Sequence, residues 1–235
     1  MTLKLMSFNT QHCMNYITRQ IDFDSFEDAI RSQNADVIGL NEMRGKGVHP
    51  EYTAQVQELA DRLGYHWYFA KAIDVNGSNP YGNGLLSRYP ILSAETILIP
   101  DPVPKDYFKH YETRCVLKAR IDVEGGLDVF VTHFGLNLDE QEKAVATIMD
   151  LLPQHRCVLM GDFNVCPDNP VLTPIREAMF DTSALFDCEK LSFPSDAPVR
   201  KIDYLFTSRD ISVLEADIPA LVVSDHRPHT ALVKL

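Results

Sequence analysis

The chain has 235 residues, 45% of them hydrophobic, which is enough apolar material for a substantial buried core. Acidic residues outnumber basic ones by 33 to 22, and the formal net charge of -11 disfavours proteins that attract nucleic acid or anionic lipid at long range. No apolar run could span a bilayer, no secretory signal pattern opens the chain, and the five cysteines are scattered without a CxxC pair. We therefore expect a cytoplasmic protein with no stable membrane insertion.

The first part of the chain is predicted to alternate strands and helices. In order, the predicted elements are a strand at residues 3–8, a helix that starts in a capping box formed by Asp24 and Glu27, a buried strand at residues 37–40, a helix at residues 53–63, an aromatic strand at residues 65–70, and a polar Gly/Asn/Pro loop extending through Gly84. No linker or repeat interrupts the sequence, so residues 1–235 are predicted to form one domain.

The second part is richer in strands. Its predicted elements are strands at residues 85–87 and 91–99, a proline-rich surface loop at residues 99–106, strands at residues 114–123 and 127–132 around a Gly125-Gly126 hairpin turn, helices at residues 138–152 and 170–179, and strands at residues 157–160, 201–206 and 230–235. Many strands, few helices and at least one hairpin favour an α/β fold with mixed rather than purely parallel sheets.

Polar or ionisable residues repeatedly occur where a predicted apolar strand ends. These residues are Asn9, Glu42, His133, Asp162, Asn164, Asp225 and His226. One such residue could be an ordinary turn former or helix cap, and GDFN alone would fit a simple turn. Five strand ends of this kind in one chain instead indicate a set of reactive groups displayed at one edge of a sheet.

The chemistry of this set favours a hard divalent cation. Carboxylate and amide oxygens suit Mg²⁺, and also Mn²⁺ or Ca²⁺, whereas a zinc site would favour His and Cys at short spacing. Histidine is a poor ligand for Mg²⁺, so His133 and His226 are free to act as acid, base or hydrogen-bond donor. This combination is typical of phosphoryl transfer, in which a cation neutralises phosphate oxygens and a base activates water.

Seven short strings together resemble the motifs of the endonuclease/exonuclease/phosphatase superfamily. They are MSFNT (residues 6–10), GLNE (39–42), YGNGLLSR (81–88), VTHFGL (131–136), GDFN (161–164), KIDYLF (201–206) and SDHRP (224–228). Each string is weak alone, but their order along nearly the whole chain is specific. The resemblance implies a four-layer α/β sandwich of the deoxyribonuclease I type, in which two mixed sheets pack face to face between outer helices. It also implies an active site at one rim.

The resemblance also implies a role for each matching residue. Metal binding is assigned to Glu42, Asn9 and Asp225. Catalytic roles fall on Asp162 (orientation or deprotonation of water), Asn164 (a hydrogen bond to phosphate), His226 (phosphate contact or base), Asp203 (partner of that histidine), His133 (phosphate or leaving group) and Arg114 in ETRC (scissile phosphate). The VTHFGL string argues against the abasic-site endonucleases, which lack this histidine. The partner of His133 stays open, with Asn83 in the corresponding region.

The resemblance implies a Mg²⁺-dependent phosphoesterase that hydrolyses a phosphomonoester or phosphodiester. We expect a monomer whose substrate is a small-molecule, lipid-derived or nucleotide phosphate ester. A nuclease of the deoxyribonuclease I type is the alternative, although the acidic balance and the lack of a basic cluster disfavour it. A catalytically inactive scaffold is a third reading, and the complete residue set argues against it. For Asp203, a structural salt bridge is the competing interpretation.

Overall fold

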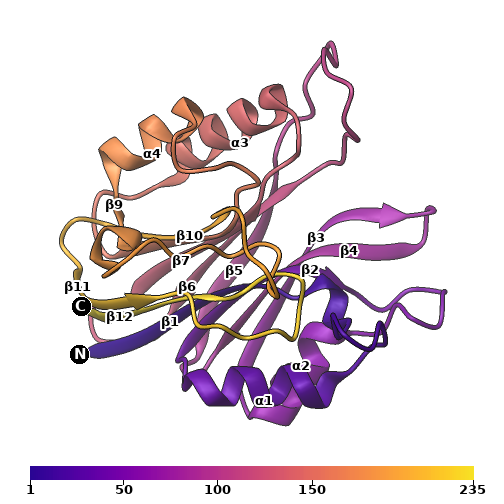
Figure 1. Ribbon diagram of the computed structural model, residues 1–235, viewed down its shortest axis with the longest axis horizontal. Helices are drawn as coiled ribbons and strands as arrows, with labels where there is room; N and C mark the ends of the chain where they lie inside the picture. The colour runs from indigo at the N-terminus through magenta and orange to yellow at the C-terminus, as the bar shows by residue number, and fades with distance from the viewer.

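Two six-stranded β-sheets pack face to face in the computed structural model, which describes residues 1–235. Helices cover both outer surfaces, with α1 and α2 below one sheet and α3 and α4 above the other (Figure 1). The sheets contain parallel and antiparallel pairs. This arrangement confirms the predicted four-layer α/β sandwich.

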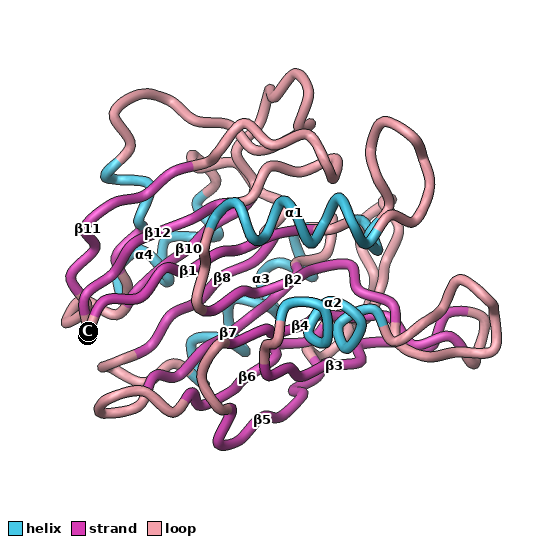
Figure 2. The backbone as a smooth tube through the Cα atoms, turned by 90° about the horizontal axis from the view of Figure 1, so that it is seen from below, coloured by secondary structure: helices cyan, strands magenta, loops and turns pink.

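The first sheet has the strand order β11–β12–β1–β2–β4–β3, and α1 and α2 lie across it (Figure 2). Its strands are β1 (Thr2–Asn9), β2 (Val37–Arg44), β3 (His66–Val75), β4 (Asn79–Ser87), β11 (Ser212–Asp217) and β12 (His229–Lys234), and its helices are α1 (Phe23–Gln33) and α2 (Gln55–Leu63). Strands β1 and β2 are parallel, and β12 runs antiparallel to β1.

The second sheet has the order β5–β6–β7–β8–β10–β9. Its strands are β5 (Ile91–Leu98), β6 (Cys115–Ile121), β7 (Leu127–His133), β8 (Cys157–Asp162), β9 (Phe180–Asp181) and β10 (Asp203–Thr207), its helices are α3 (Leu138–Leu151) and α4 (Thr173–Ala178), and the 3-10 turns of the chain are η1 (Gln11–Cys13), η2 (Pro170–Leu172) and η3 (Thr182–Leu185). Strands β7 and β8 are parallel, and β10 is antiparallel to β8.

Side-chain alternation along the strands divides the interior into three apolar layers. One layer lies between the sheets and includes Leu5 of β1 and Met160 of β8. A second lies between the first sheet and its helices, and a third between the second sheet and its helices. The sheets approach closely at Gly39, where an added Cβ would lie 2.7 Å from the sulfur of Met160. Glycine is therefore required at this position of GLNE.

Several predictions from the sequence were wrong in this fold. Helix α1 is capped by Asp22, whose side chain accepts the N–H of Ser25, so Asp24 and Glu27 do not form the predicted capping box. The two-residue strand β9 was not predicted.

The segment predicted as a polar loop through Gly84 is mostly a hairpin, because β3 continues to Val75 and β4 already begins at Asn79. Its turn is formed by Asn76 and Gly77, both with positive φ. Strand β11 was not predicted, since it is a half-exposed strand at a sheet edge, without a regular alternation of apolar residues.

Candidate active site

The strand directions bring all of the predicted site residues to one edge of the sandwich. Asn9, His133 and Asp162 are the last residues of β1, β7 and β8, and Asp203 is the first residue of β10. In the strand register, Asp162 lies opposite both His133 and Asp203. The carboxyl ends of parallel strands meet at one edge, and an antiparallel neighbour contributes its amino end there. Residues 153 positions apart, Asn9 and Asp162, therefore come into contact.

At this edge the inward-facing positions change from apolar to polar. Strand β8 directs Val158 and Met160 between the sheets, and the next inward position is Asp162. The same alternation turns Asn9, Asn41, Asn83, His133 and Asp203 inward, and all five are buried. The inter-sheet layer thus ends in a buried polar cluster, where each group needs a partner to offset the cost of desolvation.

The Asp162 carboxylate is the point on which this cluster converges. Its Oδ2 atom accepts a hydrogen bond from Asn9 Nδ2 at 3.0 Å and lies 3.5 Å from His133 Nε2 and 3.7 Å from His226 Nε2. Its Oδ1 atom accepts the backbone N–H of Asn164 at 2.9 Å. Burial raises the pKa of Asp162 above its ordinary value, although the nearby His226 opposes this shift.

Asp203 and His226 form a buried pair. His226 Nδ1 lies 2.8 Å from Asp203 Oδ2, a distance that fixes the orientation of the imidazole ring. Burial alone would lower the pKa of His226, but the carboxylates of Asp203 and Asp162 outweigh it and raise the pKa to about 10. His226 is therefore an imidazolium near neutral pH, with its Nε2–H directed toward Asp162. Phe193 packs against the same ring, with centroids 4.8 Å apart.

His133 has the opposite electrostatic character. Burial and the Arg114 guanidinium hold the pKa of His133 well below its ordinary value, so the ring is neutral. Arg114 Nη1 lies 3.2 Å from His133 Nδ1, and Asn164 Nδ2 lies 3.1 Å from His133 Nε2. Glu112 forms an ion pair with Arg114 at 2.6 Å. The side chains of Arg114 and Asn164 therefore contact the His133 ring. Asn83 does not bond to it, because Asn83 bonds Asn41 and the carbonyl of Cys115 instead.

The GDFN turn explains how Asp162 and Asn164 are held. An added Cβ on Gly161 would lie 1.8 Å from the carbonyl oxygen of Thr132, so only glycine allows this approach of β8 to β7. Phe163 points the other way, into the layer under α3, where its ring lies 4.5 Å from that of Phe134. Asn164 has a φ of 54°, a left-handed conformation that asparagine tolerates. The two polar side chains thereby face the cluster while the intervening ring anchors the turn.

A second group of oxygen atoms lies beside this cluster, at the rim. Glu42 occupies an irregularity in the pairing of β2 with β4 and has a φ of 61°, which turns its side chain out of the strand pattern. Glu42 Oε1 accepts from Asn9 Nδ2 at 3.2 Å, and Asp225 Oδ2 accepts from Gln11 Nε2 at 3.1 Å. Burial raises the pKa of Glu42, and the charge of Asp225 adds to the effect. Neither carboxylate forms an ion pair with a lysine or arginine side chain.

The donor set fits a hard divalent cation. The rim supplies carboxylate oxygens from Glu42 and Asp225, and Gln11 Oε1 is buried without a hydrogen-bond partner. Deeper in the site, possible ligand atoms of Asp162, Asp203 and His226 lie within 4.8 Å of one another, and His226 would have to lose a proton to bind a cation there. Asp203 Oδ1 is likewise buried without a partner. Unpartnered oxygens in a buried acidic cluster are the feature that a bound cation would satisfy.

Two neighbours of the site, Asn41 and Gln11, were not singled out from the sequence. Asn41 bridges the two sheets directly beneath Asp162, and the signal was available, because this asparagine interrupts the apolar run of β2. Gln11 and His12 lie in a left-handed turn, where Gln11, His12 and Cys13 have φ values of 46°, 51° and 57°. His12 Nδ1 is 3.7 Å from Glu42 Oε2. No sequence pattern signals three successive non-glycine residues in that conformation.

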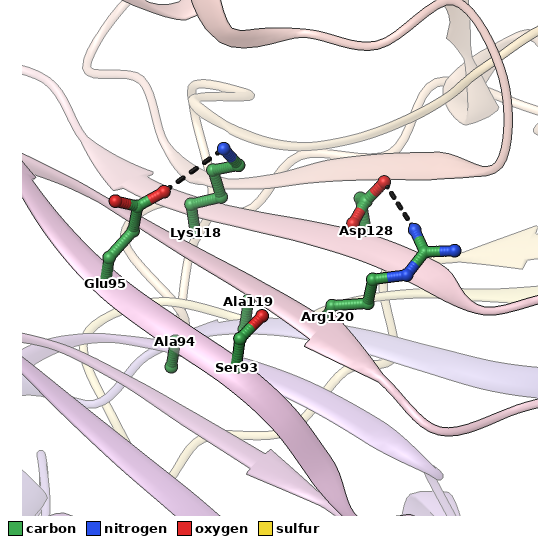
Figure 3. A pocket seen from close by; sticks show the side chains of 7 residues that line it. All are labelled: Ser93, Ala94, Glu95, Lys118, Ala119, Arg120 and Asp128. Carbon is green, nitrogen blue, oxygen red and sulfur yellow. Dashed lines mark hydrogen bonds and ion pairs between the residues drawn. The ribbon is translucent and has the colours of Figure 1, made fainter.

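A hollow elsewhere on the second sheet is unrelated to this site. It lies on β5, β6 and β7, toward the strand ends that are opposite to Arg114 and His133 (Figure 3). Its charged side chains pair with each other, Glu95 with Lys118 at 3.1 Å and Arg120 with Asp128 at 2.8 Å. The hollow therefore presents no unpaired charge to a ligand.

Known proteins resemble this one over the whole chain, two of them in a comparison of structures. YbhP of Escherichia coli (strain K12) is 23% identical over 264 residues, which cover 100% of this chain and 97% of YbhP. An endonuclease/exonuclease/phosphatase from Beutenbergia cavernae superposes with a TM-score of 0.84 at 22% identity, covering 100% of this chain and 72% of that one. Mannosyl-6-phosphatase Bt3783 of Bacteroides thetaiotaomicron gives a TM-score of 0.77 at 14% identity, covering 99% and 100%.

No helix of the structure has both the length and the apolar character needed to cross a membrane.

A family model settles the relationship. The model of the endonuclease/exonuclease/phosphatase family matches residues 6–226, which include every residue of the site described above. The chain belongs to the endonuclease/exonuclease/phosphatase family.

Proposed function

We propose that the protein hydrolyses a phosphate ester by divalent-cation-assisted attack of water. The observation that carries this proposal is the convergence of Asn9, His133 and His226 on Asp162 Oδ2, beside the carboxylates of Glu42 and Asp225, which pair with no lysine or arginine. One half of the site is suited to a cation, and the other half offers a base and hydrogen-bond donors to phosphate. Phosphatases and nucleases of this family provide the precedent.

The pKa shifts separate the roles of the central groups. Asp162 is a carboxylate whose pKa is raised by burial, as suits a group that orients water and takes its proton. His226 is held as an imidazolium by Asp203. We therefore assign it the role of stabilising the negative charge that develops on the phosphoryl oxygens. Because it already carries a proton, we do not assign it as the base. Asn164 and Arg114 would supply further donors to the phosphate.

A bound Mg²⁺ or Mn²⁺ ion would neutralise phosphate oxygens and polarise the phosphorus centre. Glu42 and Asp225 would hold it, with Asn9 beside them. Asn9 Nδ2 also joins Glu42 to Asp162, so the same side chain fixes the cation-binding carboxylate relative to the proposed base.

The test is hydrolysis of bis-p-nitrophenyl phosphate and p-nitrophenyl phosphate with Mg²⁺, Mn²⁺ or EDTA. We expect cation-dependent turnover in the wild type. Glu42→Ala, Asp162→Ala and His226→Ala should each lower kcat/KM by about 100-fold or more, with unchanged circular dichroism. The exposed Glu51, which pairs only with Arg44, provides the matched control, and Glu51→Ala should keep wild-type turnover. Wild-type rates in all three site variants would refute the assignment.

A further inference from the structure

An apolar trough leads away from the proposed catalytic centre. A cavity of about 750 Å³ begins at Asn164 and is lined by Phe108, Leu136, Leu138 and Val165. A second, mostly apolar hollow of about 480 Å³ continues over α3 and η2, where Met149 and Val171 line it. The two share Leu138 and Pro170, so together they form one path, here named the trough.

The outer wall of the trough is held in place rather than free. It is formed by the segment between β5 and β6, which projects beyond the second sheet near the start of α3 (Figure 1). Lys109 N–H donates to Asn137 Oδ1, and Asn137 Nδ2 donates to the Lys109 carbonyl, both at 3.2 Å. The Tyr111 hydroxyl donates to Asp139 at 2.7 Å. Directly before Lys109, which bonds Asn137, the wall presents Tyr107 and Phe108, whose side chains are 44% and 104% exposed.

Most polar side chains of the trough are engaged within the protein, and the exceptions are the exposed carboxylates of Glu142 and Asp168. Asn137 is part of the capping box of α3, and Gln141 Nε2 donates to the carbonyl of Gly135. Asn169 Oδ1 accepts from Val171 N–H, and Lys109 Nζ donates to the carbonyl of Leu136. Apart from these two carboxylates, few donors or acceptors are left for the hydroxyls of a sugar or the edge of a base. The larger part of the surface that the trough offers a ligand is aliphatic and aromatic.

From these features we infer that the trough binds an alkyl chain carried by the phosphate ester that the centre hydrolyses. The inference rests on the proposed function, because Asn164 joins the trough to the catalytic cluster. A phosphate placed at Asn164 and His226 would direct the organic group of the ester past Leu136 and Leu138. The acidic net charge of -11 and the occupied polar groups favour such a chain over a polynucleotide.

The first test measures how catalysis depends on chain length. Monoalkyl phosphates and alkyl p-nitrophenyl phosphates with ethyl, hexyl and decyl chains are compared below their critical micelle concentrations, with Mg²⁺ present. From ethyl to hexyl, kcat/KM should rise at least tenfold, and full burial of the added methylenes would give roughly 200-fold. A nucleoside monophosphate hydrolysed faster than the hexyl esters would overturn the inference in favour of a nucleotide.

Variants locate the effect in the trough. In Leu138→Ser and Met149→Ser, kcat/KM should depend less steeply on the length of the alkyl chain. Leu92→Ser is the matched control, because Leu92 is 60% exposed near the far end of β5. This variant should keep the wild-type ratio of kcat/KM for the decyl ester to kcat/KM for the ethyl ester. A wild-type ratio in both trough variants would also overturn the inference.

Calorimetric titration with ethyl-, hexyl- and decylphosphonate separates the two proposals. If no ester in either series is hydrolysed with Mg²⁺ or Mn²⁺, the proposed function fails, whereas the phosphonates still report on the trough. Affinity that increases with chain length in the wild type, and less so in Leu138→Ser, supports the inference. Equal affinity for all three phosphonates overturns it even when hydrolysis is observed.

Discussion

The side-chain oxygen of Asn41 on β2 accepts the backbone N–H of Asp162 on β8 at 2.9 Å, across the interface between the two sheets. The Nδ2 atom of Asn41 donates to the carbonyl of Thr132 at 2.8 Å and to Asn83 Oδ1 at 2.9 Å. All of these groups are buried. One amide therefore fixes the end of β8, and with it the carboxylate on which the proposed centre depends.

The replacement Asn41→Ala should destabilise the fold markedly. It would leave the N–H of Asp162, the carbonyl of Thr132 and Asn83 Oδ1 without this partner, and we expect a loss of about 3 kcal/mol in the free energy of unfolding. Urea denaturation measures it. Gln154 is an exposed amide and provides the control, since Gln154→Ala should change stability by less than about 0.5 kcal/mol. Equal stability of Asn41→Ala and the wild type would show that the bridge is dispensable.

Asp203→Asn should change the protonation of His226. The carboxylates of Asp203 and Asp162 hold the pKa of His226 at about 10 against the effect of burial, so removal of one charge should lower it by more than one unit. NMR titration of the His226 imidazole measures this shift. In the wild type, the stabilisation from the charged ring is fully present below pH 6.5 and is lost as the pH rises toward 10. An unchanged His226 pKa in Asp203→Asn would contradict the pairing.

Glu42 and Asp225 should provide most of the affinity for a divalent cation. Calorimetry with Mn²⁺ alone, without substrate, should show binding to the wild type that weakens at least about tenfold in Glu42→Gln and in Asp225→Asn. Both replacements keep the shape of the side chain and remove one charge. Asp150→Asn on the exposed face of α3 should bind like the wild type. Equal Mn²⁺ affinity in all variants would contradict this assignment and indicate that the cation binds at the deeper cluster of Asp162, Asp203 and His226.

Patterns in the sequence predicted most of the fold and the residues that the structure gathers at the candidate site. The strand ends at Asn9, His133 and Asp162 were visible because a largely apolar strand segment stops at each of them. The hairpin of β3 and β4 was not, since its edge position tolerates polar residues and glycine. Asn41 was visible as a polar break in an apolar run, but the groups that it bridges, and the left-handed turn at Gln11, depend on contacts with residues far away in the chain. Local sequence carries no record of such contacts.

The buried His229, which is not among the residues proposed to bind the cation, should make the stability of the fold depend on pH. Its ring is buried, its Nε2 lies 2.9 Å from Thr182 Oγ1, and burial, helped by Lys201, lowers the pKa to about 3. An unfolded chain takes up this proton near pH 6.5, so the stability that His229 contributes is complete above pH 6.5 and is lost as the pH falls toward 3.

In urea unfolding at pH 7, 6 and 5, the wild type should therefore lose up to about 1.4 kcal/mol per pH unit from this one group. His229→Gln should show a shallower pH dependence, whatever its stability at pH 7. His66 is exposed on β3, and His66→Gln should keep the wild-type slope. The prediction is wrong if His229→Gln and the wild type lose stability in parallel, because the folded state would then accept the proton as readily as the unfolded chain.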